Sequence, residues 1–197
     1  MNATGPNANR PNAPAPAHHG VTEPSPWVRR WTHLVPVGAC VLDVACGAGR
    51  HVRWFAGRGC AVVGIDREAG TVAPLNGIAE IHVADIEGGP WPLQGVRFDA
   101  VICTNYLWRP LLPTLVESLR DGGVLICETF AVGNETVGRP ANPAFLLRPG
   151  ELLAAATGLR VIAYEDGFLE TPERFVQRIV AVRAPVAGDG PQRWRLD

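Results

Sequence analysis

Short apolar runs alternate with stretches of helical periodicity over most of the chain. The runs lie at residues 41–45, 61–65, 81–84, 98–103 and 124–127. Each is apolar almost throughout rather than at every second position, which is typical of parallel strands that helices cover on both faces. The pattern therefore predicts five strands of a parallel sheet, connected mainly by helices.

Helical spacing of apolar residues is clearest in two segments. Ser25-Pro26 pairs a helix-capping residue with proline at the first helical position, and apolar residues follow at helical intervals as far as Leu34. Between 112 and 119, apolar side chains again recur every three or four residues, before Asp121-Gly122-Gly123. We expect one helix before the first strand and another between the fourth and fifth, with a further helix at 50–58.

The end of the chain has a different pattern. A helix at 151–157 is followed by two strand-like runs, 159–164 and 175–183, without helical periodicity between them. Such runs form an antiparallel pair. The sequence thus predicts an α/β fold: a doubly wound, mostly parallel seven-stranded sheet with helices on both faces and a C-terminal antiparallel strand pair.

Composition divides the 197 residues into three parts. Residues 1–24 are rich in Pro, Asn and Ala, and we expect a disordered arm there. Residues 25–183 form the predicted domain, and 184–197 a C-terminal tail. One domain of this length is sufficient to bury a core.

Charge excludes several classes of function. All 18 basic residues are arginine, so Schiff-base chemistry on a lysine and a phosphate-loop lysine are excluded. The net charge of -1 gives no basic excess, so nucleic acid is not an expected partner.

No apolar stretch is long enough to span a membrane, and no signal peptide is recognisable, which predicts a cytoplasmic protein. The five cysteines lack C-x-x-C spacing, so we expect buried, reduced thiols and no metal site.

Candidate chemistry centres on the first strand and the glycine turn after it, Asp43-Val-Ala-Cys-Gly-Ala-Gly49. Gly47 and Gly49 permit backbone conformations closed to other residues and allow a ligand to approach the main chain. Acids follow the same pattern on neighbouring strands: Asp66 ends the second and Asp85 the third. Ligands of such sheets bind outside the carboxyl ends of the strands.

Asp66 lies 17 residues after Gly49. A carboxylate at this place accepts hydrogen bonds from both hydroxyls of an adenosine ribose. The glycine turn and Asp66 together predict an adenosine-containing cofactor.

On these residues the chain resembles the class I S-adenosylmethionine-dependent methyltransferases, over roughly residues 25–183. Within that class, Gly49-Arg50-His51 and the segments 145–152 and 158–166 are similar to the tellurite-resistance methyltransferase family. The resemblance implies a Rossmann-like methyltransferase fold and S-adenosylmethionine as the cofactor. It also implies the cofactor-binding residues, in chain order: Asp43, Ala45, Gly47, Gly49, Asp66, Arg67, Asp85, Ile86 and Asn105.

The resemblance also distributes these residues over the cofactor. Ala45, Gly47 and Gly49 would line the methionine part, and Asn105 would lie near the sulfonium. Asp66 would bind the ribose. At the adenine we expect Arg67, Asp85 and Ile86.

A nicotinamide dehydrogenase is the main rival on the same fold. Its fingerprint has a third glycine where this chain has Val52, and it leaves Asp43 and Asp85 without a role. The methyltransferase is therefore favoured.

Residues that follow the fourth and fifth strands are candidates for acceptor chemistry. Glu128 is a candidate base or substrate contact, or else forms a structural ion pair with an arginine. Tyr106 either lines the acceptor pocket or packs beneath Trp108, and Arg109 is a substrate-binding candidate. We therefore list Tyr106 and Glu128 as candidate catalytic residues.

The connection 131–148 is long and holds two glycines and two prolines, as in a lid over the substrate. Arg139 and Arg148 on it are candidates to bind an anion, or are solvated surface residues.

The predicted activity is methyl transfer to a small-molecule acceptor, with a thiol or a chalcogen oxyanion as candidates. Two alternatives stay open. A cofactor-binding regulatory protein would bind without turnover. An RNA or protein methyltransferase would present a basic face formed by Arg29, Arg30, Arg50, Arg53 and Arg58.

Overall fold

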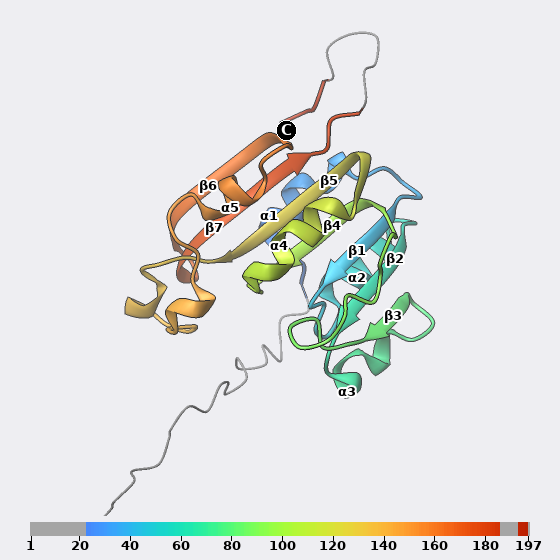
Figure 1. Cartoon of the computed structure of the whole chain (residues 1–197), viewed down its shortest axis with the longest axis horizontal. Helices are drawn as coiled ribbons and strands as arrows, with labels where there is room; N and C mark the ends of the chain where they lie inside the picture. Colours follow the sequence, from blue (N-terminus) through green and yellow to red (C-terminus); the bar gives the residue numbers. More distant parts are fainter. Residues whose placement is uncertain (1–22, 186–192, 197) are drawn as a thin grey trace, which may run out of the picture.

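A computed structural model describes residues 23–185 and 193–196 (Figure 1). Seven strands form one sheet in the order β3-β2-β1-β4-β5-β7-β6. Their bounds are β1 Cys40–Val44, β2 Ala61–Asp66, β3 Glu80–Val83, β4 Phe98–Thr104, β5 Leu119–Phe130, β6 Arg160–Glu170 and β7 Glu173–Val182. Neighbouring strands are parallel from β3 to β5, whereas β7 is antiparallel to both β5 and β6. The predicted fold class is confirmed.

Helices cover both faces of this sheet (Figure 1). Helices α1 (Pro26–Trp31) and α2 (Arg50–Ala56) lie on one face, and α4 (Leu112–Glu117) and α5 (Glu151–Ala155) on the other. Helix α3 (Ala69–Val72) lies near β3 at the edge. Single 3₁₀ turns occur at Thr32–Leu34, Ala73–Leu75, Arg109–Leu111, Asn134–Thr136 and Pro143–Phe145.

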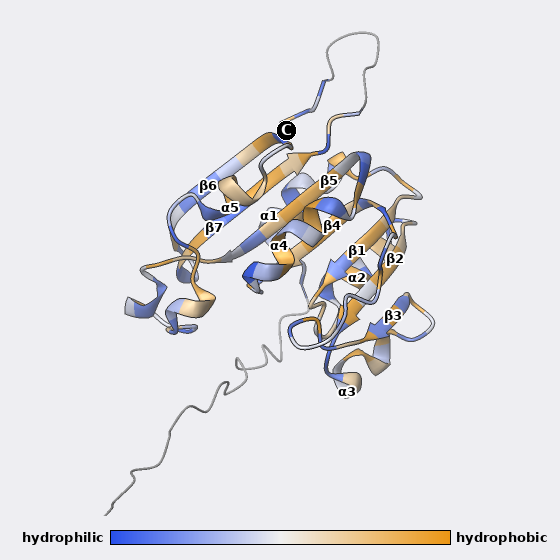
Figure 2. Cartoon of the chain, in the orientation of Figure 1, coloured by the Kyte–Doolittle hydropathy of each residue, from blue (hydrophilic) through white to orange (hydrophobic). Residues whose placement is uncertain are grey.

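The central strands bury both faces, which explains their unbroken apolar character (Figure 2). Alternate residues of β1 enter two separate cores: Leu42 packs with Leu115 of α4, and Val41 packs with Trp27 and Phe55 of α1 and α2. Because successive side chains of a strand point to opposite faces, one apolar run supplies both layers. Burial of each such large side chain stabilises the fold by about 1.5–3 kcal/mol.

Helix α1 begins where the sequence predicts. The Ser25 hydroxyl oxygen accepts a hydrogen bond from the backbone N–H of Trp27 at 3.1 Å, and Pro26 occupies the first helical position. A serine cap of this kind contributes about 1 kcal/mol. Trp27 and Trp31 are fully buried, so α1 is anchored as part of the core.

Strand β5 is longer than predicted. The helix before it ends at Glu117, and β5 begins at Leu119 rather than at Val124. Asp121-Gly122-Gly123 lies inside the strand, where Gly122 has φ 80° and donates its backbone N–H to the carbonyl oxygen of Arg183 at 2.8 Å. The pairing register with β4 shifts at this point. The glycines therefore make an irregularity within the strand instead of ending the helix.

The last two strands pair as an antiparallel hairpin, as predicted. Arg160 pairs with Val182 at one end and Glu170 with Glu173 at the other. Residues 1–22, nearly all of the predicted arm, lie outside the described residues, as does most of the tail beyond 185. Trp194, which is described, packs against the core on the α1 side.

None of the helices in residues 23–185 and 193–196 has the length and apolarity to cross a membrane. All five cysteines are free thiols. Cys46, Cys103 and Cys127 are buried as expected, but Cys40 and Cys60, at the start of β1 and just before β2, are only half-buried.

Candidate functional site

The candidate site lies at the carboxyl ends of β1 and β4, where the strand order of the sheet reverses direction. Loops leaving the two strands diverge at such a point and open a crevice for a ligand. The only non-glycine residues of the described chain with positive φ follow these strands: Ala45 (φ 52°) after β1 and Asn105 (φ 55°) after β4. Backbone in this region costs energy and concentrates at functional sites.

The glycine turn after β1 is held by the acid at the end of β2. The backbone N–H of Gly47 donates to Oδ2 of Asp66 at 2.8 Å, and that of Glu68 donates to Oδ1 at 3.0 Å. These bonds fix the Asp66 carboxylate beside the turn. Because a carboxylate has acceptor sites for about four hydrogen bonds, it retains acceptors for ribose hydroxyls.

The two glycines of the turn have different surroundings. At Gly47 (φ 53°) an added Cβ would meet no atom within 4 Å, so this position faces open space. At Gly49 (φ 78°) an added Cβ would lie 2.3 Å from Cδ2 of Leu75, which is fully buried. Gly47 therefore leaves room for a ligand, whereas Gly49 is required by packing.

Three buried polar atoms at the carboxyl ends of β1 and β4 have no hydrogen-bond partner within the described residues: Oδ2 of Asp43, Oδ1 of Asn105 and the Tyr106 hydroxyl. Asp43 is 1% exposed, and its other oxygen lies 3.7 Å from Nδ1 of His51. Unpaired buried polar atoms are costly, so their concentration here is expected of a ligand site. Burial, then the nearby Glu87, raises the pKa of Tyr106, so its hydroxyl stays protonated.

The predicted adenine side of the site lies after β2 and β3. Asp85 is exposed, and its Oδ1 accepts backbone N–H groups of Glu87 at 3.0 Å and Gly88 at 3.2 Å, which hold its pKa below the usual range. Ile86 packs partly against the core, and Arg67 is exposed beside Glu68. Their roles at an adenine stay predictions.

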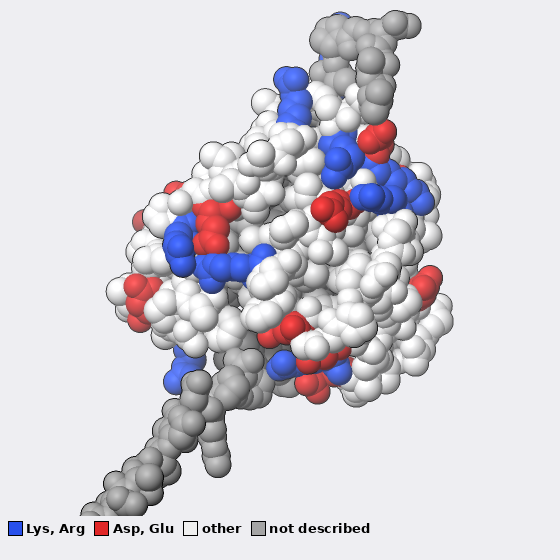
Figure 3. All heavy atoms as spheres, viewed as in Figure 1, with Lys and Arg blue, Asp and Glu red and all other residues white. Residues whose placement is uncertain are grey.

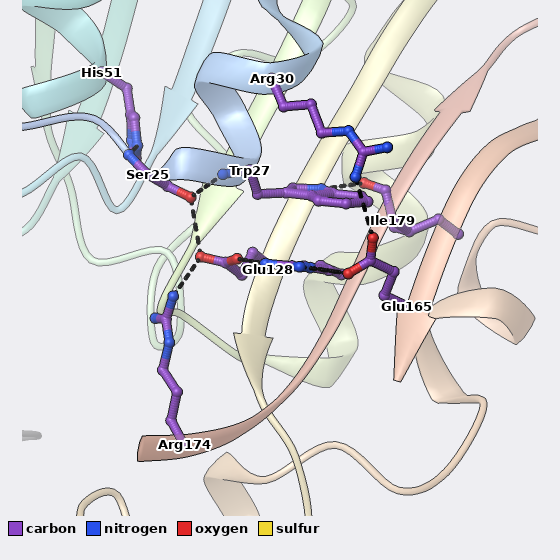
Figure 4. Close-up of polar contacts among 9 residues, drawn as sticks. Ser25, Trp27, Arg30, His51, Glu128, Glu165, Arg174 and Ile179 are labelled. Atoms are coloured by element: carbon purple, nitrogen blue, oxygen red, sulfur yellow. Dashed lines mark hydrogen bonds and ion pairs between the residues drawn. The ribbon is translucent and has the colours of Figure 1, made fainter. Parts of the chain in front are cut away.

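Glu128 at the end of β5 is 1% exposed and fully engaged (Figure 4). Its Oε1 accepts the Ser25 hydroxyl at 3.0 Å and Nη2 of Arg174 at 3.3 Å, and its Oε2 lies 3.4 Å from Nη1 of Arg178. Of the two alternatives stated for Glu128, the structure shows the arginine ion pairs. A role as base stays a prediction.

Two arginines that the sequence analysis did not select as acceptor-site residues, Arg50 and Arg174, approach the same place. Nη2 of Arg50 donates to the Thr104 hydroxyl at 3.0 Å, at the end of β4, and Arg50 has no ion pair among the described residues. Burial lowers the pKa of Arg50, the nearby carboxylates of Asp43 and Glu128 oppose this shift, and the charge of Arg174 adds to it. Nε of Arg174 is buried without a hydrogen-bond partner among the described residues. In the sequence, Arg174 and Arg178 are four residues apart and so lie on one face of a strand, and this spacing could have identified the arginines around Glu128.

The connection 131–148 is anchored by the candidate substrate residue Arg109. Arg109 binds both oxygens of Glu151, with Nε at 2.6 Å and Nη2 at 3.0 Å, and donates to the carbonyl oxygens of Ala144 and Leu146. Most of its donors are thus engaged within the protein. Arg139 and Arg148 are exposed on the connection. The charges of Arg109 and Arg148 both act on Glu151, and the backbone N–H of Arg148 donates to its Oε2 at 2.8 Å. The binding roles of the three arginines stay predictions.

Comparison with known proteins finds one family model for part of the chain. Residues 41–123, which hold the glycine turn and all three acids, match a family model described as a methyltransferase domain. This part of the chain is therefore similar to methyltransferase domains. No curated protein matches the sequence.

Solved structures of methyltransferases share the fold of this chain. TehB from Haemophilus influenzae is similar at 19% identity and a TM-score of 0.64, over 79% of this chain and 60% of that one. This chain thus spans 60% of that protein's length. A TehB-like S-adenosylmethionine-dependent methyltransferase from Corynebacterium glutamicum is 20% identical over 78% and 85% of the chains, with a TM-score of 0.59.

A third structure carries a cofactor product. Magnesium protoporphyrin IX methyltransferase from Synechocystis, with bound S-adenosylhomocysteine, is 18% identical over 80% of this chain and 79% of that one, with a TM-score of 0.59. The resemblance to class I methyltransferases is confirmed by the family model and by the fold. The unpaired atoms of Asp43 and Asn105, with the open space at Gly47, fit the cofactor that the resemblance implies, S-adenosylmethionine.

Proposed function

We propose that this protein transfers a methyl group from S-adenosylmethionine to a small anionic acceptor, with a thiol or a chalcogen oxyanion as candidates. The observation that carries the proposal is a pair of unpaired oxygens, of Asp43 and Asn105, at the β1–β4 reversal. They lie beside a glycine turn that is bound to Asp66.

When bound, the cofactor supplies an electrophilic methyl group on a positively charged sulfur. The chain's own residues would bind and orient it: Asp66 at the ribose, and Asp43 and Asn105 at the methionine part. Transfer by in-line displacement needs alignment of the reacting atoms at about 3–3.5 Å and exclusion of water.

The acceptor side is basic. Within the described residues, the guanidinium group of Arg50 has no ion pair. The Nε–H of Arg174 is buried there without a hydrogen-bond partner. Guanidinium groups in a partly desolvated site favour anions. An acceptor that arrives already deprotonated, such as a thiolate or an oxyanion, needs no base, which agrees with the engagement of Glu128 in ion pairs.

The test is transfer of labelled methyl groups to a panel of thiols, tellurite, selenite and small carboxylic acids. We expect turnover with an anionic member, and at least about a tenfold rise in its KM for Arg174→Gln, the loss of one charge-assisted hydrogen bond. Arg120→Gln is the matched control, because Arg120 pairs with Asp99 at the start of β4, at the other end of the strands. Cofactor binding without turnover on any acceptor would contradict the proposal and favour the regulatory alternative.

The RNA or protein alternative requires a continuous basic face. Arg50, one of its five predicted arginines, points instead to Thr104. On the face seen in Figure 3, basic and acidic side chains of the described residues are interspersed. The geometry therefore supports a small acceptor better.

A further inference from the structure

Ser25 links two parts of the site that are far apart in the sequence. Its hydroxyl group donates to Oε1 of Glu128 at 3.0 Å, the shortest contact of that carboxylate, because the two arginines lie at 3.3 and 3.4 Å. Its backbone N–H donates to Nε2 of His51 at 3.1 Å. Ser25 itself is 2% exposed (Figure 4).

The bond to His51 fixes the state of that ring. Since Nε2 accepts a hydrogen bond, a neutral His51 carries its proton on Nδ1, the nitrogen that lies 3.7 Å from Oδ1 of Asp43. His51 is 2% exposed and lies on α2, directly after the glycine turn. Ser25 thus contacts Glu128 directly and is connected to Asp43 through His51.

Helix α1 holds Ser25 in this place. The Ser25 oxygen caps the helix by accepting the N–H of Trp27, and the Trp27 ring lies 4.7 Å from the Arg178 guanidinium carbon. Arg178 pairs with Glu128 and also with Glu165. The start of α1 therefore supports both the carboxylate of Glu128 and one of its cations.

We infer that Ser25 is a positioning residue for the methyl-transfer site: it orients Glu128 through its hydroxyl group and His51, and with it Asp43, through its backbone N–H. The inference rests on the proposed function, in which Asp43 faces the cofactor and Glu128 the acceptor side. Docking of α1 onto the sheet is then a condition for an ordered site.

The inference predicts what Glu128 loses when the Ser25 hydroxyl is removed. The Glu128 carboxylate faces Ser25 from the α1 cap, Arg174 and Arg178 from β7, and the charge of Arg50 from α2. Without the Ser25 hydroxyl, Oε1 of Glu128 loses its shortest contact and keeps only Arg174, at 3.3 Å. Loss of a hydrogen bond of this strength corresponds to about a tenfold loss in kcat if the carboxylate must stay ordered.

The experiment compares Ser25→Ala and Ser25→Gly with Thr32→Val. Glycine retains most of the capping, so the two Ser25 variants remove the same hydroxyl at different costs in stability. Thr32 is the control because its buried hydroxyl donates to Val28 and accepts from Trp54, away from the site. Carboxyl ¹³C NMR at one pH, assigned with Glu128→Gln, follows the chemical shift of the Glu128 carboxyl carbon without cofactor or acceptor, and methyl transfer is measured separately.

We expect a changed carboxyl chemical shift of Glu128 and a lower kcat in both Ser25 variants, and neither change in Thr32→Val. An unchanged Glu128 chemical shift in the Ser25 variants, or an equal loss of kcat in Thr32→Val, overturns the inference. If the unaltered protein turns over no acceptor, the proposed function fails, and the chemical shift alone still decides whether Ser25 orients Glu128.

Discussion

The two glycines of the turn after β1 have different consequences when each is replaced by alanine. Both have positive φ, which costs a residue with a side chain about 1–2 kcal/mol. At Gly49 the new methyl group would also lie 2.3 and 2.5 Å from the two terminal carbons of Leu75. Leu75 is fully buried and packed in the α1-side core, so the clash adds an overpacking cost of about 1–3 kcal/mol.

We therefore expect Gly49→Ala to lower the free energy of unfolding by about 2–5 kcal/mol, and Gly47→Ala by only about 1–2 kcal/mol. The effects of the two substitutions on cofactor binding should not follow the order of their effects on stability. The methyl group of Gly47→Ala enters the open space at the crevice, so this variant should stay folded and lose affinity for S-adenosylhomocysteine.

Urea unfolding and isothermal titration calorimetry on both variants provide the test. The reasoning is refuted if Gly47→Ala is the less stable of the two. It is refuted equally if Gly47→Ala binds S-adenosylhomocysteine as tightly as the unaltered chain, since the space beside Gly47 would then not belong to the cofactor.

Three further predictions concern other parts of the molecule. Arg109 holds the pKa of Glu151 below its usual value, so Glu151→Gln should lower the free energy of unfolding by about 1–2 kcal/mol at pH 7. In urea unfolding across pH, this loss should shrink as the pH falls below about 4.3 and through the lower folded-state pKa. A loss that stays constant with pH would contradict the ion pair. Tyr106→Phe removes a hydroxyl without a partner among the described residues, so thermal unfolding should show equal or higher stability while the KM of the acceptor changes; a large loss of stability would reveal a structural bond. A hydrogen bond with Cys127, opposite in the sheet, and then burial raise the pKa of Cys103, so neither of these two thiols should react with iodoacetamide at pH 8 until urea unfolds the protein; labelling of Cys103 or Cys127 in the folded chain, located by mass spectrometry, would contradict the packing.

The sheet was predictable because its signal is local. Each central strand is an apolar run, since both of its faces are buried. Ser25-Pro26 predicts the start of α1, because serine is a capping residue and proline favours the first helical position. The error at β5 arose because Gly122 has the same local appearance at a helix end and in a strand irregularity. Only its bond to Arg183, 61 residues away in the chain, distinguishes the two.

The contact that holds the glycine turn also involves residues that the sequence singles out. Asp66 bonds to Gly47, 19 residues away, and lies in the motif that the spacing identifies, while its role at a ribose stays a prediction. The acceptor side depends on contacts between distant segments, such as Ser25 with Glu128 over 103 residues and Arg109 with Glu151 over 42. Periodicity and spacing do not reveal such pairs, so the sequence analysis identified Ser25 only as a cap and Arg109 only as a substrate-binding candidate.

Binding of the cofactor product tests the central claim most directly. Isothermal titration calorimetry with S-adenosylhomocysteine should show one site per chain, with NAD as a control that gives no heat. Asp66→Ala, shown by circular dichroism to be folded, should bind at least about tenfold more weakly, because it loses charge-assisted hydrogen bonds to the ribose. Absence of binding to the unaltered chain, or equal affinity in Asp66→Ala, would contradict the account.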